Sequence, residues 1–148
     1  MIKTVFGYSF KPACGCRGKT NGGFFVTVDN KGTLVYKTYL FDTIEQTKTI
    51  IQMSEQAFNS LKYALKQYAP TIQELPNRVD RPVYDGDINT FVFNDKSIET
   101  ANMIHTGSLY RTEIERQECI LSQLFTIVSG ILEQAGIHVM LTRVVLYK

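Results

Sequence analysis

The side chains best suited to chemistry lie at residues 13–20, which have the sequence ACGCRGKT. Glycines followed by Gly-Lys-Thr form the minimal pattern of a phosphate-binding loop. Such a loop must open a helix, because the first amides of that helix hold the anion. Residues 24–29 instead alternate and are rich in aromatic and β-branched types, which predicts a strand. The pattern therefore does not predict a nucleotide site, but Arg17, Lys19 and the loop amides remain candidates for binding an anion without catalysis.

The two cysteines of this loop are candidate ligands for a metal ion. Cys14 and Cys16 have a spacing that suits zinc or copper, and a closed zinc site needs about four ligands. The remaining candidates are Cys119, which lies within a predicted helix, and two isolated histidines, His105 and His138. We therefore predict no metal and no other cofactor, and we expect Cys119 to be a small core residue.

A second group of candidate side chains lies in residues 70–87. Asp85-Gly86-Asp87 opens like a calcium-binding loop, but Thr90 and Lys96 stand where a glycine and a bidentate glutamate are required. Asp-Gly before a strand is also typical of a turn. One hypothesis that stays open is a small enzyme or ligand-binding protein. Its pocket would lie near loops 11–23 and 70–87, and it would use Cys14, Cys16, Asp85 and Asp87.

The elements that position these residues begin with a strand at 2–10 and a hairpin at 24–41. The turn Asn30-Lys31-Gly32 places glycine where a left-handed conformation is needed. This register sets Val28 opposite Leu34, Val26 opposite Tyr36 and Phe24 opposite Thr38, on one mostly apolar face that should face the core. The other face carries Phe25, Thr27, Val35, Lys37 and Tyr39. We expect that face to be either a contact surface or covered by a helix.

The remaining pattern predicts two helices and further strands. A strand at 46–53 precedes a helix that Ser54 caps and that ends before Pro70, and residues 70–87 are irregular. Strands follow at 88–94 and 97–104. Thr112 and Glu115 form a capping box that opens a long apolar helix ending near Gly136, before a last strand at 138–147. This order resembles that of many small bacterial α+β domains. We predict one α+β domain over residues 1–148, with a largely antiparallel sheet of about six or seven strands and two helices on one face.

Composition narrows the class of protein. The 148 residues are 44% hydrophobic and 20% charged, with a net charge of +2 and an odd number of cysteines, three. Lys11 interrupts the apolar start, and no apolar run is long enough to cross a bilayer. We therefore expect a cytoplasmic protein without membrane contact. Residues 1–40 carry six Lys or Arg against one acid, Asp29, which indicates either an anionic partner or a solvated sheet edge.

No acid, base, nucleophile or metal set emerges from these patterns. The first hypothesis is accordingly a non-catalytic protein-binding module, such as an adaptor, an inhibitor or an immunity-type partner. The residues expected to bind are Arg17, Lys19, Phe25, Lys37 and Tyr39. Besides the ligand-binding hypothesis, a third possibility is binding of single-stranded nucleic acid by the aromatic and basic N-terminal sheet, although the net charge is low for that role.

Overall fold

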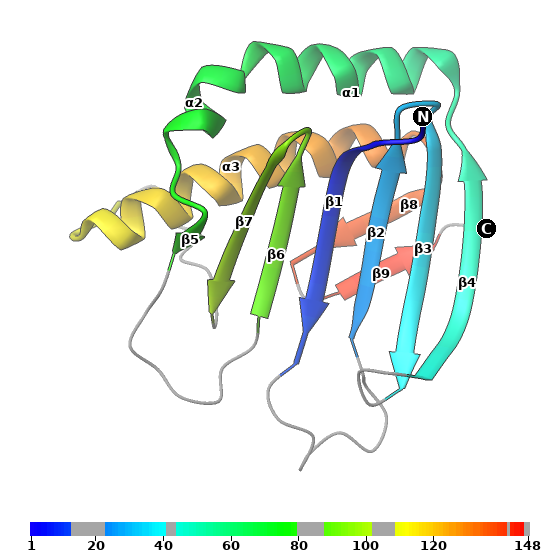
Figure 1. Cartoon of the computed structure of the whole chain (residues 1–148), viewed down its shortest axis with the longest axis horizontal. Helices are drawn as coiled ribbons and strands as arrows, with labels where there is room; N and C mark the ends of the chain where they lie inside the picture. The colour runs from blue at the N-terminus through cyan, green and yellow to red at the C-terminus, as the bar shows by residue number, and fades with distance from the viewer. Residues whose placement is uncertain (13–22, 41–43, 80–87, 102–108, 142, 147–148) are drawn as a thin grey trace.

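A computed structural model of the chain describes residues 1–12, 23–40, 44–79, 88–101, 109–141 and 143–146 (Figure 1). Its elements, in chain order, are β1 (Thr4–Lys11), β2 (Phe24–Asp29), β3 (Thr33–Leu40), β4 (Ile44–Gln52), α1 (Glu55–Gln67), α2 (Ala69–Glu74), β5 (Arg78–Val79), β6 (Ile88–Phe93), β7 (Lys96–Ala101), α3 (Glu113–Glu133), β8 (Ile137–Met140) and β9 (Arg143–Leu146).

Seven of the strands form one sheet in the order β4-β3-β2-β1-β6-β7-β5. Neighbouring strands are antiparallel except for the short β5, which runs parallel to β7. The predicted β2–β3 register is confirmed: Val28 lies opposite Leu34, and Phe24 lies opposite Thr38. Gly32 has a φ of +80°, as the turn required.

The first helix follows its predicted boundaries. The Ser54 side chain accepts a hydrogen bond from the Ala57 amide at 3.1 Å, which caps the N-terminus of α1. Residues 70–87 were predicted to be irregular, and this is wrong for residues 70–74, which belong to α2, and for residues 78–79, which form β5. The helix α2 starts at Ala69 with Pro70 in its first turn, where proline needs no amide hydrogen and its fixed φ suits a helix. Residues 80–87 lie outside the described residues.

The long helix α3 begins with the predicted Thr112 cap, whose hydroxyl accepts from the Glu115 amide at 3.1 Å. The Glu115 carboxylate accepts from the Arg111 amide at 2.9 Å, one residue earlier than the capping box predicts. Beyond the helix, Gly136 adopts a left-handed φ of +91°. The last segment was predicted as one strand. It is instead a hairpin of β8 and β9, which forms a separate two-stranded sheet.

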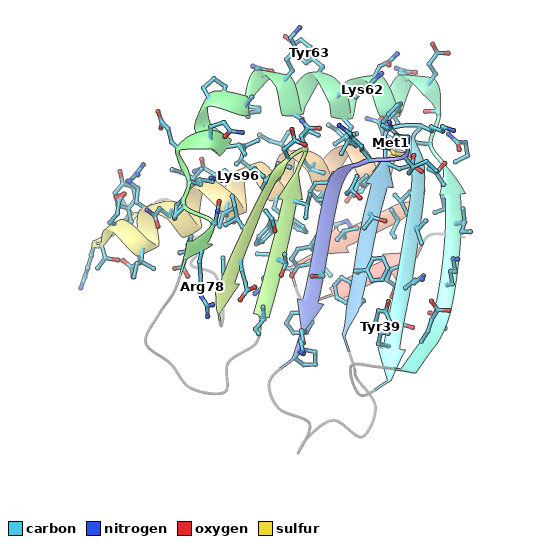
Figure 2. The ribbon with its side chains drawn as sticks, viewed as in Figure 1. Met1, Tyr39, Lys62, Tyr63, Arg78 and Lys96 are labelled. Carbon is cyan, nitrogen blue, oxygen red and sulfur yellow. The ribbon has the colours of Figure 1, made fainter. Side chains whose placement is uncertain are left out.

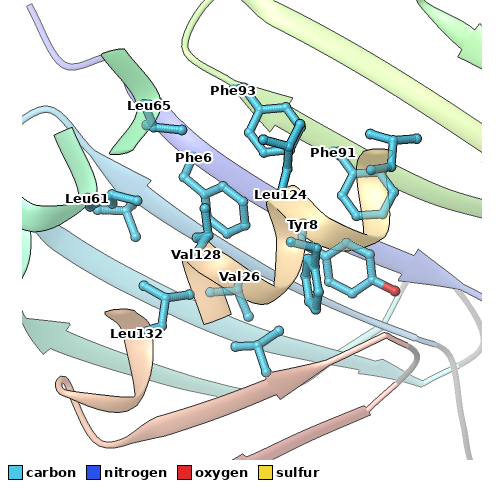
Figure 3. Close-up of a cluster of buried hydrophobic side chains, with 14 of the residues drawn as sticks. Phe6, Tyr8, Val26, Leu61, Leu65, Phe91, Phe93, Leu124, Val128 and Leu132 are labelled. Carbon is cyan, nitrogen blue, oxygen red and sulfur yellow. The ribbon is translucent and has the colours of Figure 1, made fainter. Parts of the chain in front are cut away.

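The core lies between one face of the large sheet and a layer made of the helices α1 and α3 and the β8–β9 hairpin (Figure 1). Phe6, Tyr8 and Phe91 from the sheet are buried against Leu124 and Val128 of α3 (Figure 3). Tyr8 contacts Phe125 with 4.9 Å between ring centroids. The predicted α+β class, with an antiparallel sheet and helices on one face, is confirmed. No helix in the described part of the chain is long and apolar enough to cross a membrane.

Candidate functional site

The face of the sheet opposite the core is not covered by any described helix. In Figure 1, α3 and the β8–β9 hairpin lie behind the sheet, and no described element lies across the middle of the near face. We call this near face the open face. Its side chains are half-buried or exposed, apart from Gly7, which its neighbours bury. The strand registers place on this face Gly7, Ser9, Phe25, Thr27, Thr33, Val35, Lys37, Tyr39, Glu45, Lys48, Ile50, Gln52, Thr90, Val92, Ser97 and Glu99.

An aromatic pair lies at the centre of the β2–β3 half of this face. Phe25 and Tyr39 stack with 5.8 Å between ring centroids and 26° between ring planes. The Lys37 ammonium lies 5.6 Å from the centre of the Phe25 ring. Strand pairing explains the contact, because Phe25 is directly opposite Lys37 and Tyr39 is two residues further along the same face. All three side chains are half-buried although no described helix covers them.

The charge of Lys37 is satisfied within the same face. Its Nζ lies 2.8 Å from Oε1 of Glu45 on β4. That hydrogen bond holds the pKa of the Glu45 carboxyl below its ordinary value and raises the pKa of the Lys37 ammonium. Glu45 reaches the open face because the β3–β4 pairing shifts between Thr38 and Tyr39, which leaves an extra residue in β4 and places Glu45 opposite Tyr39.

Beside the aromatic pair, the open face carries smaller residues on β1. Gly7 of β1 lies between Thr27 and Val92, and Ser9 lies between Phe25 and Thr90. A Cβ added at Gly7 would lie 3.4 Å from the Val92 Cβ, which is an ordinary contact, so glycine is not required there by space. Thr27 and Val92 cover Gly7, so the β1 backbone is buried at this position.

Three of the five sequence-predicted binding residues, Phe25, Lys37 and Tyr39, therefore form one cluster. Arg17 and Lys19 lie outside the described residues, and their role stays a prediction. Sequence reasoning missed Glu45, Lys48 and Ile50 as members of this face. Its predicted strand began at residue 46 and so left Glu45 out, and only the β3–β4 register could have revealed that Lys48 and Ile50 share a face with Lys37.

The residues of the alternative pocket, Cys14, Cys16, Asp85 and Asp87, lie outside the described residues. Cys119 is buried in α3, where desolvation raises the pKa of its thiol, as an inert core cysteine requires. A depression of about 420 Å³ lies between α3 and β8. The hydroxyls of two residues that line it donate to backbone carbonyls, Ser129 to Val139 and Thr126 to Ser122. In the part of the chain that the structure describes, no group of three His, Cys, Asp or Glu side chains is placed to hold a metal.

Comparison with known proteins found no family model that matches the chain and no match among the curated proteins. The open face therefore has to be interpreted from its own geometry and charge.

Proposed function

We propose that this chain is a non-catalytic protein-binding module, and that it binds its partner through the open face around Phe25, Lys37 and Tyr39. The observation that carries the proposal is the stacked Phe25–Tyr39 pair on a sheet face that no described element covers. Aromatic side chains are enriched at the centres of protein interfaces, where they bury a large area at a small cost in conformational entropy. An adaptor, an inhibitor and an immunity-type protein would all use such a surface.

The pairing of charges favours a protein over a nucleic acid as the partner. A single-stranded nucleic acid needs aromatic rings with free faces and lysines available to phosphate. Here Phe25 and Tyr39 stack on one another, and the Lys37 ammonium is already bound by Glu45. Paired charges around an apolar centre are instead the arrangement expected at the margin of a protein interface.

The test begins with a photo-crosslinking amino acid at position 39, introduced into the full chain in its native host. A matched probe at Tyr63, which is 69% exposed on α1, serves as the control. Figure 2 shows Tyr39 on the sheet and Tyr63 on the helix, well apart. We expect a discrete crosslinked protein from position 39 and none from position 63.

The crosslinked protein is then purified, and its affinity for this chain is measured. The double variant Lys37→Glu with Tyr39→Ala removes the centre of the proposed interface, and we expect affinity to fall about tenfold or more. The control variant Lys62→Glu with Tyr63→Ala makes the same two changes on α1 and should leave affinity unchanged. Equal affinities for the two double variants, or no adduct at position 39, would refute the proposal.

A further inference from the structure

Strand β4 is a long sheet edge. It has nine residues, and within the described residues it pairs only with β3. The opposite edge of the sheet, β5, has only two residues. Long edges are usually protected, because their unpaired amides and carbonyls can bind another strand. On β4 the protection consists of a bulge before Thr47 and one lysine, Lys48, which leaves Thr47–Gln52 as a regular edge.

The hydrogen-bond pattern shows which residues present their backbone outward. The Met53 amide donates to the Gly32 carbonyl at 2.9 Å, so Met53 faces β3. In an antiparallel ladder the bonding direction alternates with every residue. Thr47, Thr49 and Ile51 therefore bond to β3, whereas Lys48 and Ile50 direct their amides and carbonyls to the free edge. The side chains of these two residues lie on the open face, in register with Lys37 and Val35.

Along this edge, one lysine lacks an ion-pair partner among the described residues and one isoleucine remains exposed. Lys48 lies directly opposite Lys37. Among the described residues the nearby carboxylate is Glu45, which forms its salt bridge with Lys37 and interacts with Lys48 only through a weaker coulombic attraction. Lys48 forms no ion pair in the part of the chain that the structure describes. Ile50 is 60% exposed, although it lies beside Val35. Like charges on directly opposite residues destabilise a sheet, so a further carboxylate beside Lys48 would complete the cluster.

We propose that an extended segment of the protein partner adds a strand to β4, with an acidic side chain opposite Lys48 and an apolar side chain opposite Ile50. This inference rests on the proposed function and names the chemistry of its partner. Because Lys48 and Ile50 are two residues apart on one face, the acidic and apolar residues of the added strand are also two residues apart, in either strand direction. A second copy of this chain fits poorly, because Thr47–Gln52 contains no acidic residue to place beside Lys48.

The experiment selects ligands for the full-length protein from a displayed library of random nine-residue segments. On the wild-type chain we expect enrichment of Asp or Glu two residues from Val, Ile or Leu. On the Lys48→Glu variant we expect the acidic position to change to Lys or Arg, and we expect the peptides selected on the wild-type chain to bind about fivefold more weakly. No enrichment, or the same preference on both proteins, would overturn the inference.

A second pair of variants tests the backbone contact. Ile50→Pro removes an amide that does not bond to β3, so we expect the fold to persist while a selected peptide binds at least tenfold more weakly. Ile50→Val keeps the amide and should retain binding, and urea unfolding checks that both variants are folded. Equal binding by the two variants would exclude strand addition. Another outcome is that the selection yields no binding peptide while Lys37→Glu with Tyr39→Ala still abolishes binding of the purified partner. That result would refute strand addition to β4 and leave the proposed function intact.

Discussion

The two faces of the large sheet are built from adjacent residues of the same strands, but one face is buried in the core and the other is not covered by any described helix. In β2, Phe24, Val26 and Val28 are buried in the core, whereas Phe25 and Thr27 between them remain half-exposed. The core face gathers aromatic rings that pack against α3, and the open face carries a small-residue centre with an aromatic pair and lysines at one side. The core face therefore attaches the sheet to the helix layer, whereas the open face buries less apolar surface within the described residues.

The largest expected change in the free energy of unfolding comes from replacing a core phenylalanine. Phe91 is fully buried and packs against Tyr8, Phe93 and Phe125. Phe91→Ala removes a ring and leaves a cavity, so we expect the free energy of unfolding to fall by about 3–5 kcal/mol, measured by urea denaturation.

The matched change on the open face is Phe25→Ala. Because that ring is already partly in contact with water, its loss should lower the free energy of unfolding by less than about 1.5 kcal/mol. Similar losses for the two variants would mean that the open face is part of the core of the folded protein, and the comparison between faces would fail.

A smaller effect is expected for the polar group within the core face. The Tyr8 hydroxyl donates to Asn89 Oδ1 at 2.5 Å, and both side chains are buried. Tyr8→Phe keeps the ring and removes this donor, so the unfolding free energy should fall by about 1–3 kcal/mol. Tyr39→Phe on the open face is the control, and thermal unfolding should show almost no change there. A neutral Tyr8→Phe would mean that the hydrogen bond does not contribute to stability.

The core face could be predicted from the sequence because burial imposes a repeating pattern. The alternation of Phe24, Val26 and Val28 and the glycine at position 32 together fixed both the β2–β3 register and the side that faces inward. The sequence pattern failed to predict α2, because a proline can either end a helix or occupy the first turn of a new one. Pro70 ends one helix and opens the next, and both roles follow from the same missing amide hydrogen.

The candidate site was only partly predictable, for a physical reason. Phe25, Lys37 and Tyr39 were found because one hairpin places them on one face. Glu45, Lys48 and Ile50 join them through the β3–β4 pairing, and a bulge shifts that register by one residue. A bulge is an insertion in backbone pairing and leaves little trace in local residue patterns. The charge balance of the open face therefore required the structure.

A substitution at Gly7 is expected to change the free energy of unfolding by a smaller amount, and to raise it rather than lower it. Glycine in the middle of a strand costs about 0.5–1 kcal/mol relative to alanine, because it loses more conformational freedom on folding. A Cβ at Gly7 meets only Val92 and Thr27 at ordinary contact distances. Gly7→Ala should therefore raise the unfolding free energy by up to about 1 kcal/mol, measured by urea denaturation. No rise in stability would mean that the added Cβ displaces Val92 or Thr27.

The smallest expected effect is on the pH dependence of stability, and it arises from the Lys37–Glu45 salt bridge. Their hydrogen bond lowers the pKa of Glu45 from its ordinary value of 4.5, so its contribution to stability is present above pH 4.5 and is lost as pH falls through the lowered value. The raised pKa of Lys37 works in the opposite sense, with a contribution present below pH 10.5 and lost above it. Glu45→Gln should therefore reduce the loss of stability between about pH 5 and pH 2, measured as the urea midpoint. In a Lys37→Met background the same substitution should change this acid dependence little, because the carboxyl has already lost its partner. An equal effect of Glu45→Gln with and without Lys37 would mean that the acid dependence arises elsewhere in the chain, and that the charge pairing of the open face is not established in solution.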